Sequence, residues 1–281
     1  GFYEKHKEHL EKAYVWLTYQ DTNNDYLVEQ GESAGWDDEM PRIGTVLYPN
    51  TLWYWLHKLR VEVEKRTDLE EAKNRIYEGV NTLLWVHKSD DRGMNYVPDN
   101  QYTKDMVYAS TMIEYSNAQA VYVPYYLGFS SHRTFEMRFE VYGNILACLT
   151  GLADEKKAEL ITQEILRAGV NLPYPIKVLY PPIYPGEPDW RPYMSKGRQN
   201  YPWQYHNAGI WPYIGGFWVK WLAQYNKDLA KKDLEKLAAA NAINDWEFNE
   251  YLHGQHGTPM GVPYQSWNMA MYIEAYKAVN G

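Results

Sequence analysis

The chain has 281 residues and a formal net charge of -8, and its 28 basic residues are scattered along the sequence. Nucleic-acid-binding proteins gather basic residues into a patch or stripe, so the composition argues against a nucleic-acid partner. The only cysteine, Cys148, lies in an apolar run, which excludes an intrachain disulfide and a zinc site built on cysteines and predicts a buried, inert thiol.

Apolar residues recur at three- and four-residue steps in nine segments, which predicts nine helices. In chain order these segments are 2–19, 50–66, 69–88, 111–127, 138–152, 154–167, 208–226, 228–242 and 263–279. Strand patterns do not separate them, so the predicted fold class is all-α. Because the sequence holds no run of about 18 apolar residues, we expect a cytoplasmic protein with no membrane partner.

Long loops rich in Gly, Pro, Asn and aromatic residues alternate with short links between the predicted helices. The long loops are 20–49, 89–110, 168–207 and 243–262. Helix pairs joined by a tight turn at one end and a long loop at the other place every long loop on one face. Loops longer than about 12 to 15 residues in a compact domain are commonly functional. We therefore expect one domain, 1–281, whose loop face forms a cleft.

The aromatic composition is unusual, with 27 Tyr and 12 Trp against 6 Phe. Tyr and Trp join an apolar ring to a polar edge, so their excess over Phe favours aromatic surface that stays partly wet. Sugar rings, which have an apolar face and a rim of hydroxyls, fit such a surface. A large core of hydrogen-bonded tyrosines explains the composition equally well.

Three segments attach loops of polar and aromatic residues to helices. They are "GESAGWDDEMPRIGTVLYPNTLWY" at 31–54, "HNAGIWPYIGGF" at 206–217, and "FNEYLHG" at 248–254 followed by "GTPMGVPYQSW" at 257–267. Together with 139–159 they resemble the (α/α)6-barrel glycoside hydrolases. That group includes the amylo-α-1,6-glucosidases of glycogen debranching, the neutral and alkaline invertases, and the processing α-glucosidases with mannosylglycerate hydrolases.

The resemblance implies a helical toroid of the (α/α)6-barrel type. The family barrel has twelve helices, whereas the periodicity predicts about nine, and the acidic loop comes early in the chain. The sequence leaves two explanations open: a compact relative with an incomplete barrel, or a chain from which the N-terminal part of the barrel is missing.

Glycosidic hydrolysis normally uses two carboxyl groups, one to protonate the leaving oxygen and one to activate water or attack the sugar. The resemblance places the general acid at Asp37 and the general base at Glu250, and it implies inversion of the anomeric carbon. Trp36 and the neighbouring acids would favour a protonated Asp37. Asp38 is the rival for this role. Three adjacent acids can also form an ordinary solvated loop or helix N-terminus.

The remaining motif residues are expected to position the sugar by stacking and hydrogen bonding. They are Trp36, Asp38, Arg42, Tyr48, Asn50, Trp53, Tyr205, His206, Asn207, Trp211, His253, Gln265 and Trp267. For Trp53, Trp211 and Trp267 taken singly, helix packing is the stronger interpretation.

One segment, Asp21 to Glu32, has the oxygen-ligand spacing of a twelve-residue calcium loop. Tyr26 replaces the glycine that such a loop needs at its sixth position, so a polar hairpin is preferred and we predict no metal site. The pairs His6 with His9 and His253 with His256 lack an evident third ligand. Cofactors are not expected either.

The sequence thus predicts an inverting α-glycosidase with a carbohydrate substrate, favouring an α-1,6-linked glucose as in glycogen debranching. Sucrose, as in the invertases, and small glycosides such as mannosylglycerate, glucosylglycerate or trehalose are the alternatives. A further alternative is a carbohydrate-binding or assembly module without turnover. Self-association, or a partner that completes the barrel, belongs to that alternative.

Overall fold

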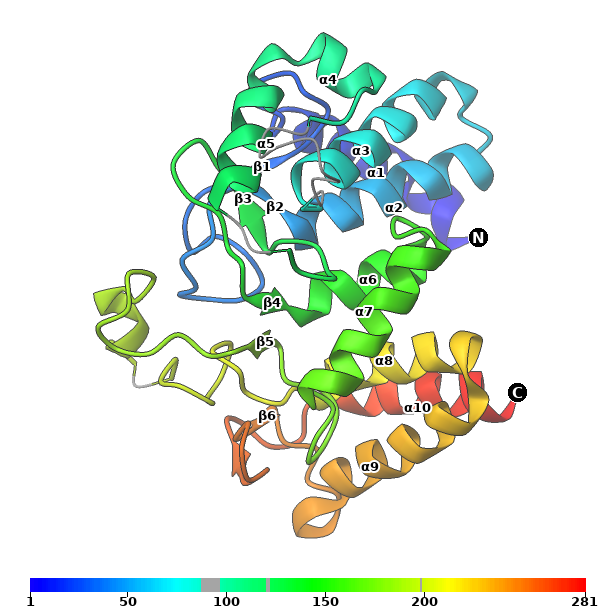
Figure 1. The fold of residues 1–281 in the computed structure, drawn as a ribbon. Coiled ribbons are helices and arrows are strands. Elements are labelled where there is room, and N and C mark those ends of the chain that lie inside the picture. The colour runs from blue at the N-terminus through cyan, green and yellow to red at the C-terminus, as the bar shows by residue number, and fades with distance from the viewer. Residues whose placement is uncertain (87–96, 120–121, 198) are drawn as a thin grey trace.

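A computed structural model of the chain describes residues 1–86, 97–119, 122–197 and 199–281. The described residues form ten α-helices and seven very short strands (Figure 1). The helices are α1 Phe2–Thr18, α2 Leu47–Glu62, α3 Glu70–Leu83, α4 Gln101–Asp105, α5 Val107–Gln119, α6 Val141–Thr150, α7 Glu155–Ala168, α8 Pro212–Tyr225, α9 Lys227–Trp246 and α10 Ser266–Asn280. Two 3-10 turns span Thr67–Leu69 and Pro192–Ser195. The predicted all-α class is confirmed.

The strands only pin loops together in antiparallel pairs. β1 Glu29–Gln30, β2 Gly44–Val46 and β3 Phe129–Ser130 form one small sheet in that order. β4 Phe139–Glu140 pairs with β5 Leu179–Tyr180, and β6 Tyr251–Leu252 pairs with β7 Pro259–Met260. Each strand has two or three residues, which is too short to leave a period-two pattern in the sequence.

Helix boundaries follow local capping chemistry. The Asp154 side chain accepts a hydrogen bond from the Lys157 amide at 2.9 Å and starts α7, which ends at Gly169 with a φ of 64°. Gly151, with a φ of 77°, ends α6 in the same way. These signals make the link between α6 and α7 short, as the sequence predicted.

Two predictions of helix position need correction. The helix expected over 111–127 is α5, which begins earlier and ends at Gln119, and residues 122–127 are not helical. Pro124 lies in that stretch and cannot donate a helical hydrogen bond. The predicted loop 89–110 contains α4, and its residues 89–96, like 87–88 of the predicted helix before it, lie outside the described residues.

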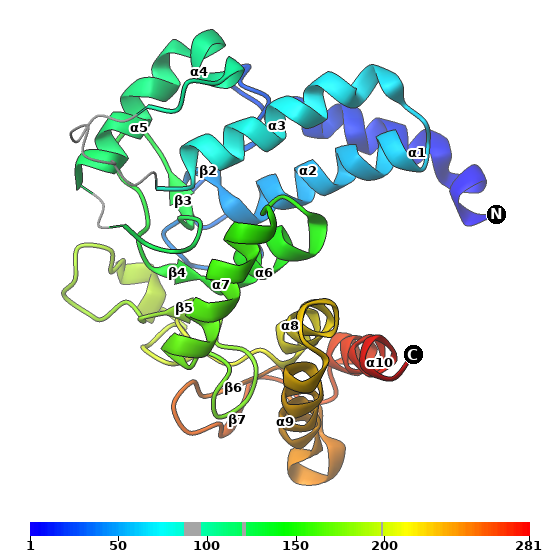
Figure 2. The same cartoon turned by 45° about the vertical axis from the view of Figure 1, so that its right-hand side comes forward.

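Seven of the described helices form two layers. α2, α6, α8 and α10 pack in succession as an inner row, while α3, α7 and α9 pack on the outside of α2, α6 and α8 respectively (Figure 2). In Figure 1 the short links from α2 to α3, α6 to α7 and α8 to α9 lie on the right, and the described parts of the long loops 20–49, 168–207 and 243–262 lie on the left. The alternation of loop lengths therefore does gather the long loops on one face.

One apolar cluster runs through most of the described chain, from Leu27 to Val279. Trp218 of α8 is fully buried in it, and its indole N–H donates to Asp233 of α9 at 2.6 Å. Cys148 is buried as predicted, and burial raises the pKa of its thiol, which makes it unreactive. None of the described helices has both the length and the apolar character that crossing a membrane requires.

Candidate active site

A pocket of about 230 Å³ brings three of the motif segments together on the loop face. It is lined by Trp36 and Asp38 from the loop after β1, by four residues at and before the start of α8, by Glu250 beside β6, and by Trp267 of α10. The four residues near α8 are Tyr205, His206, Trp211 and Tyr213. Two carboxylates from distant parts of the chain therefore share one hollow with aromatic walls.

Asp38 is exposed to this pocket and is held at three points. Its carboxylate Oδ2 accepts a hydrogen bond from the Tyr205 hydroxyl at 3.2 Å. Its main-chain oxygen accepts from Asn200 Nδ2 at 3.0 Å and from His206 Nδ1 at 3.4 Å. The carboxyl group is thus both accessible and oriented, as a group that reacts with a ligand must be.

Asp37 has a different environment. It is only 3% exposed, it is not among the residues that line the pocket, and it forms an ion pair with Arg42. An adjacent guanidinium favours the ionised carboxylate, whereas a general acid must carry a proton. The pocket lining therefore favours Asp38, the rival indicated by the sequence, as the candidate acid, and the general-acid role of Asp37 stays a prediction.

Glu250 is positioned by the β6–β7 hairpin. Its amide donates to the Val262 carbonyl at 2.9 Å, and its carboxylate Oε2 accepts from the Val262 amide at 3.0 Å. Gly261 has a φ of 74°, and a Cβ there would lie 2.5 Å from Glu250 Oε2. Only glycine fits this turn, so the motif glycine exists to let the carboxylate fold back over the hairpin.

Aromatic rings form the wall between the two carboxylates. The rings of His206 and Trp211 are stacked, with centroids 4.8 Å apart and an interplanar angle of 10°. Tyr251 stacks on the other side of Trp211 at 5.7 Å, and Trp36 meets His206 edge-on at 4.7 Å. Such flat apolar surfaces suit the C–H face of a sugar ring.

His206 is a neutral hydrogen-bond acceptor toward the pocket. Its side chain is 2% exposed, and burial lowers the pKa of His206 to about 3. Because the Asp38 carbonyl can only accept, Nδ1 carries the proton and Nε2 presents a lone pair. Neither Nε2 nor the Trp36 indole N–H, both of them buried, has a hydrogen-bond partner in the part of the chain that the structure describes. One acceptor and one donor are thus left for a ligand's hydroxyls.

The comparisons with known proteins agree with this geometry. The family model for alkaline and neutral invertases matches residues 80–280, which is well over half of the chain. The chain belongs to the alkaline and neutral invertase family. It is a family of glycoside hydrolases, as the motif resemblance implied.

Curated relatives of this family member include plant enzymes. Neutral/alkaline invertase 1, mitochondrial, of Oryza sativa subsp. japonica is 28% identical over 157 residues, covering 54% of this chain and 24% of its own length. Alkaline/neutral invertase C, mitochondrial, of Arabidopsis thaliana is 28% identical over 165 residues, covering 55% of this chain and 24% of its own length. The chain thus spans about a quarter of the relatives it matches. The predicted cytoplasmic location stays a prediction, since both names say mitochondrial.

Solved structures show the fold. A mannosylglycerate hydrolase from Thermus thermophilus, solved in complex with glucose, superposes with a TM-score of 0.52 at 15% identity, covering 83% of this chain and 48% of that chain. A second structure of the same protein, with Tris and D-glycerate, gives the same TM-score and identity. The likeness identifies the (α/α)6-barrel type, and the described helices correspond to about half of such a chain.

Several residues expected to touch sugar are instead bonded within the invertase-family fold. Asn50 is fully buried and bonds both the amide and the carbonyl of Val28, at 2.8 and 2.9 Å. Asn207 does the same for Ile183, at 2.7 and 2.8 Å. These two amides satisfy buried backbone groups, so we assign them structural roles.

Other expected contacts also lie away from the pocket lining. The Trp53 indole donates to the Tyr26 carbonyl at 3.1 Å, which fits the packing interpretation. Tyr48 lies behind Trp36, with ring centroids 5.9 Å apart, and Gln265 donates to the Val262 carbonyl at 3.3 Å. The His253 ring stacks on His256 at 3.8 Å. Tyr213, which does line the pocket, was not predicted, although it follows Trp211 and Pro212 in the motif.

A buried charge cluster adjoins the acidic loop. Arg42 is 3% exposed, pairs with Asp37, and donates from Nε to Glu136 Oε2 at 2.8 Å. Glu140 lies near it and caps α6 through the Gly143 amide at 2.7 Å. The sequence indicated Arg42 as a sugar ligand, but the structure uses its guanidinium inside the protein.

Glu140 makes stability depend on pH. Burial raises the pKa of Glu140 to about 7, so the native state binds a proton that the unfolded state has lost. The resulting stability is present below about pH 4.5 and is lost as the pH rises through about 7. Between pH 5 and 8 the free energy of unfolding should therefore fall by roughly 2–3 kcal/mol less in Glu140→Gln than in the unaltered chain. Urea unfolding at several pH values measures this difference. The same dependence of the free energy of unfolding on pH in both proteins would contradict the prediction.

The segment that resembles a calcium loop forms a polar loop of bends that leads into β1, rather than the expected hairpin, because β1 pairs with β2. Oxygens of Asp21, Asp25 and Glu29 lie within 4.8 Å of one another, and burial raises the pKa values of Asp21 and Glu29. These carboxylates accept hydrogen bonds from the amides of Thr22, Asp25, Tyr26 and Leu27. The loop therefore uses its acids to order its own backbone. The absence of a metal stays a prediction.

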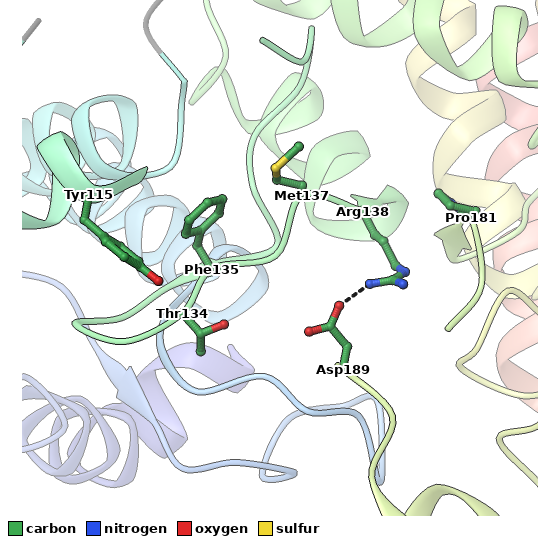
Figure 3. A pocket seen from close by; sticks show the side chains of 7 residues that line it. All are labelled: Tyr115, Thr134, Phe135, Met137, Arg138, Pro181 and Asp189. Carbon is green, nitrogen blue, oxygen red and sulfur yellow. Dashed lines mark hydrogen bonds and ion pairs between the residues drawn. The ribbon is translucent and has the colours of Figure 1, made fainter. Parts of the chain in front are cut away.

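A second, larger hollow of about 510 Å³ lies between the start of β4 and the loop after β5 (Figure 3). Its lining residues are Tyr115, Thr134, Phe135, Met137, Arg138, Pro181 and Asp189. Arg138 pairs with Asp189 and also with Glu187 at 2.8 Å, which fastens the 181–190 loop to β4. Its charged groups pair with one another, so the pocket with Asp38 and Glu250 remains the candidate active site.

Proposed function

We propose that the chain is the catalytic domain of an inverting glycoside hydrolase that cleaves an α-glucoside, with Asp38 as general acid and Glu250 as general base. The observation that supports this most directly is that both carboxylates line one small aromatic-walled pocket. Its volume of about 230 Å³ lies below the roughly 300–1,000 Å³ of drug-sized sites, which suits a single sugar ring.

In the proposed reaction the Asp38 carboxyl donates its proton to the glycosidic oxygen as the bond to the anomeric carbon breaks. Glu250 removes a proton from a water molecule that attacks the same carbon from the opposite side. Inversion requires room for this water, so the two carboxyl groups should lie about 6.5–9.5 Å apart around the substrate. Family membership and the shared pocket support this scheme.

The invertase family and the names of its relatives favour sucrose as the substrate, ahead of the α-1,6-linked glucose that the motifs suggested. Both present an α-glucosyl unit to the same two carboxylates. His206 Nε2 and the Trp36 indole supply an acceptor and a donor for the glucosyl hydroxyls, and the exposed Trp267 ring, which lines the pocket, offers a surface for stacking.

The test is sugar release from sucrose, isomaltose, panose, trehalose and glucosylglycerate by the unaltered chain. Glu250→Gln should lower the rate by about 10²–10⁴, the usual contribution of a general base. Glu247→Gln is the matched control, because Glu247 bonds Asn244 and Asn249 and does not line the pocket. Sugar binding without hydrolysis by the unaltered chain would contradict the proposal.

That last outcome would favour the alternative of a binding or assembly module. The two helices that end the inner row carry exposed apolar side chains: Trp55 and Leu59 on α2, with Val63 directly after it, and Ile273 and Tyr276 on α10. Their exposure supports a partner or a second copy that covers these edges. Light scattering of the purified chain at several concentrations tests self-association.

A further inference from the structure

We propose that Tyr205 is a positioning residue that holds the Asp38 carboxyl group in place and sets its proton affinity, an inference that rests on the proposed function. The Tyr205 hydroxyl donates to Asp38 Oδ2 at 3.2 Å. Among the described residues, no other side-chain hydrogen bond to this carboxylate is found.

Tyr205 is itself held rigidly. Its ring contacts those of His206, Tyr251 and Trp211, with centroids 3.9, 5.3 and 5.4 Å away. Its carbonyl accepts from the Trp211 indole at 3.0 Å and from the Gly209 amide at 3.1 Å. The residue also has a φ of 45°, a conformation that non-glycine residues adopt rarely and that clusters at functional sites. The phenol therefore reaches Asp38 from a fixed position.

The main chain of Asp38 is fixed independently of Tyr205. Asn200 is fully buried, donates from Nδ2 to the Asp38 carbonyl at 3.0 Å, and accepts at Oδ1 from the His206 amide at 3.0 Å. The acidic loop thus stays in place when the phenol is removed. Loss of the Tyr205 hydroxyl should then change the freedom and proton affinity of the Asp38 side chain alone.

The groups around Tyr205 and Asp38 determine in which direction loss of the Tyr205 hydroxyl changes the proton affinity of Asp38. Burial, together with the charges of Asp38 and Glu250, raises the pKa of Tyr205, so the phenol keeps its proton and remains a donor. A donor stabilises the ionised form of a carboxyl group, so its removal makes Asp38 hold its proton to higher pH. The other titratable or charged groups around Asp38 are Glu250, His206 and Tyr213 across the pocket, Asp37 and Glu39 on its own loop, and the buried Arg42.

The experiment compares kcat/KM against pH for the unaltered chain and for Tyr205→Phe, which keeps the ring contacts. The alkaline limb of this profile reports the acid of the free enzyme. We expect it to move up, with a roughly tenfold lower kcat, as loss of a hydrogen bond to a charged group implies. Tyr213→Phe is the matched control, because the Tyr213 hydroxyl bonds that of Tyr142, and its limb should stay in place.

A second readout does not depend on activity. Carboxyl-carbon NMR of protein labelled at aspartate, with Asp38 assigned from Asp38→Asn, follows the titration of this group directly. The midpoint should rise in Tyr205→Phe and not in Tyr213→Phe. Unchanged midpoints in both readouts would overturn the role of Tyr205 while leaving the hydrolase standing. A chain that hydrolyses none of the glycosides refutes the proposed function, and the NMR titration then still decides whether Tyr205 sets the proton affinity.

Discussion

Replacing Asp38 by asparagine is expected to lower kcat on the best substrate by about 10²–10⁴, the usual contribution of a positioned general acid. Asparagine keeps the size of the side chain and can still accept from Tyr205, but it has no acidic proton to give. The free energy of unfolding should change little, because Asp38 is exposed. Initial rates and urea unfolding measured on the same preparation check both parts.

Asp37→Asn is the matched comparison, since it makes the same chemical change one residue away. This substitution removes the anion that pairs with buried Arg42, and breaking a buried ion pair costs about 3–5 kcal/mol. We expect a strongly destabilised protein that retains more activity per folded molecule than Asp38→Asn. The reverse pattern, with an inactive but stable Asp37→Asn, would return the acid role to Asp37.

Arg42→Met is expected to lower the free energy of unfolding by about 3–5 kcal/mol, because it leaves the carboxylates of Asp37 and Glu136 buried without their shared cation. Methionine fills a similar apolar volume, so the loss reports charge rather than a cavity. Denaturant unfolding near pH 7 measures it.

Arg138→Met provides the control. Arg138 also joins two carboxylates, but those of Glu187 and Asp189 are 39% and 45% exposed, against 5% and 4% for Glu136 and Asp37. Exposed ion pairs contribute about 0–1 kcal/mol, so this loss should be much smaller. Equal losses for the two arginines would show that burial does not govern the strength of these pairs.

Much of the fold could be predicted from the sequence because helical periodicity is a local signal. The segments that became α2, α7 and α9 each carry it, and the alternating loop lengths placed the loops on one face. The end of α5 and the short α4 were missed, since neither left a long periodic pattern. The short strands depend on pairing between distant segments, which local patterns do not encode.

The candidate site could be located from the sequence but not resolved to single residues. The motifs indicated the segments that meet at the pocket, yet Asp37 and Asp38 are chemically equivalent neighbours. Which of them faces the pocket is decided by Arg42, whose second partner, Glu136, lies far along the chain. Asn50 and Asn207 suited sugar hydroxyls equally well on residue type, and only the fold shows that backbone groups occupy their amides.

In the proposed mechanism Asp38 and Glu250 act on one glycosidic bond from opposite sides, with a water molecule beside Glu250. Proton NMR of the first glucose released from an α-glucoside, recorded before the two anomers equilibrate, tests this most directly. Inversion requires that β-glucose appears first and that Glu250→Gln does not release it at a comparable rate. Initial release of α-glucose would contradict the account, because it would require a covalent intermediate between closer carboxylates.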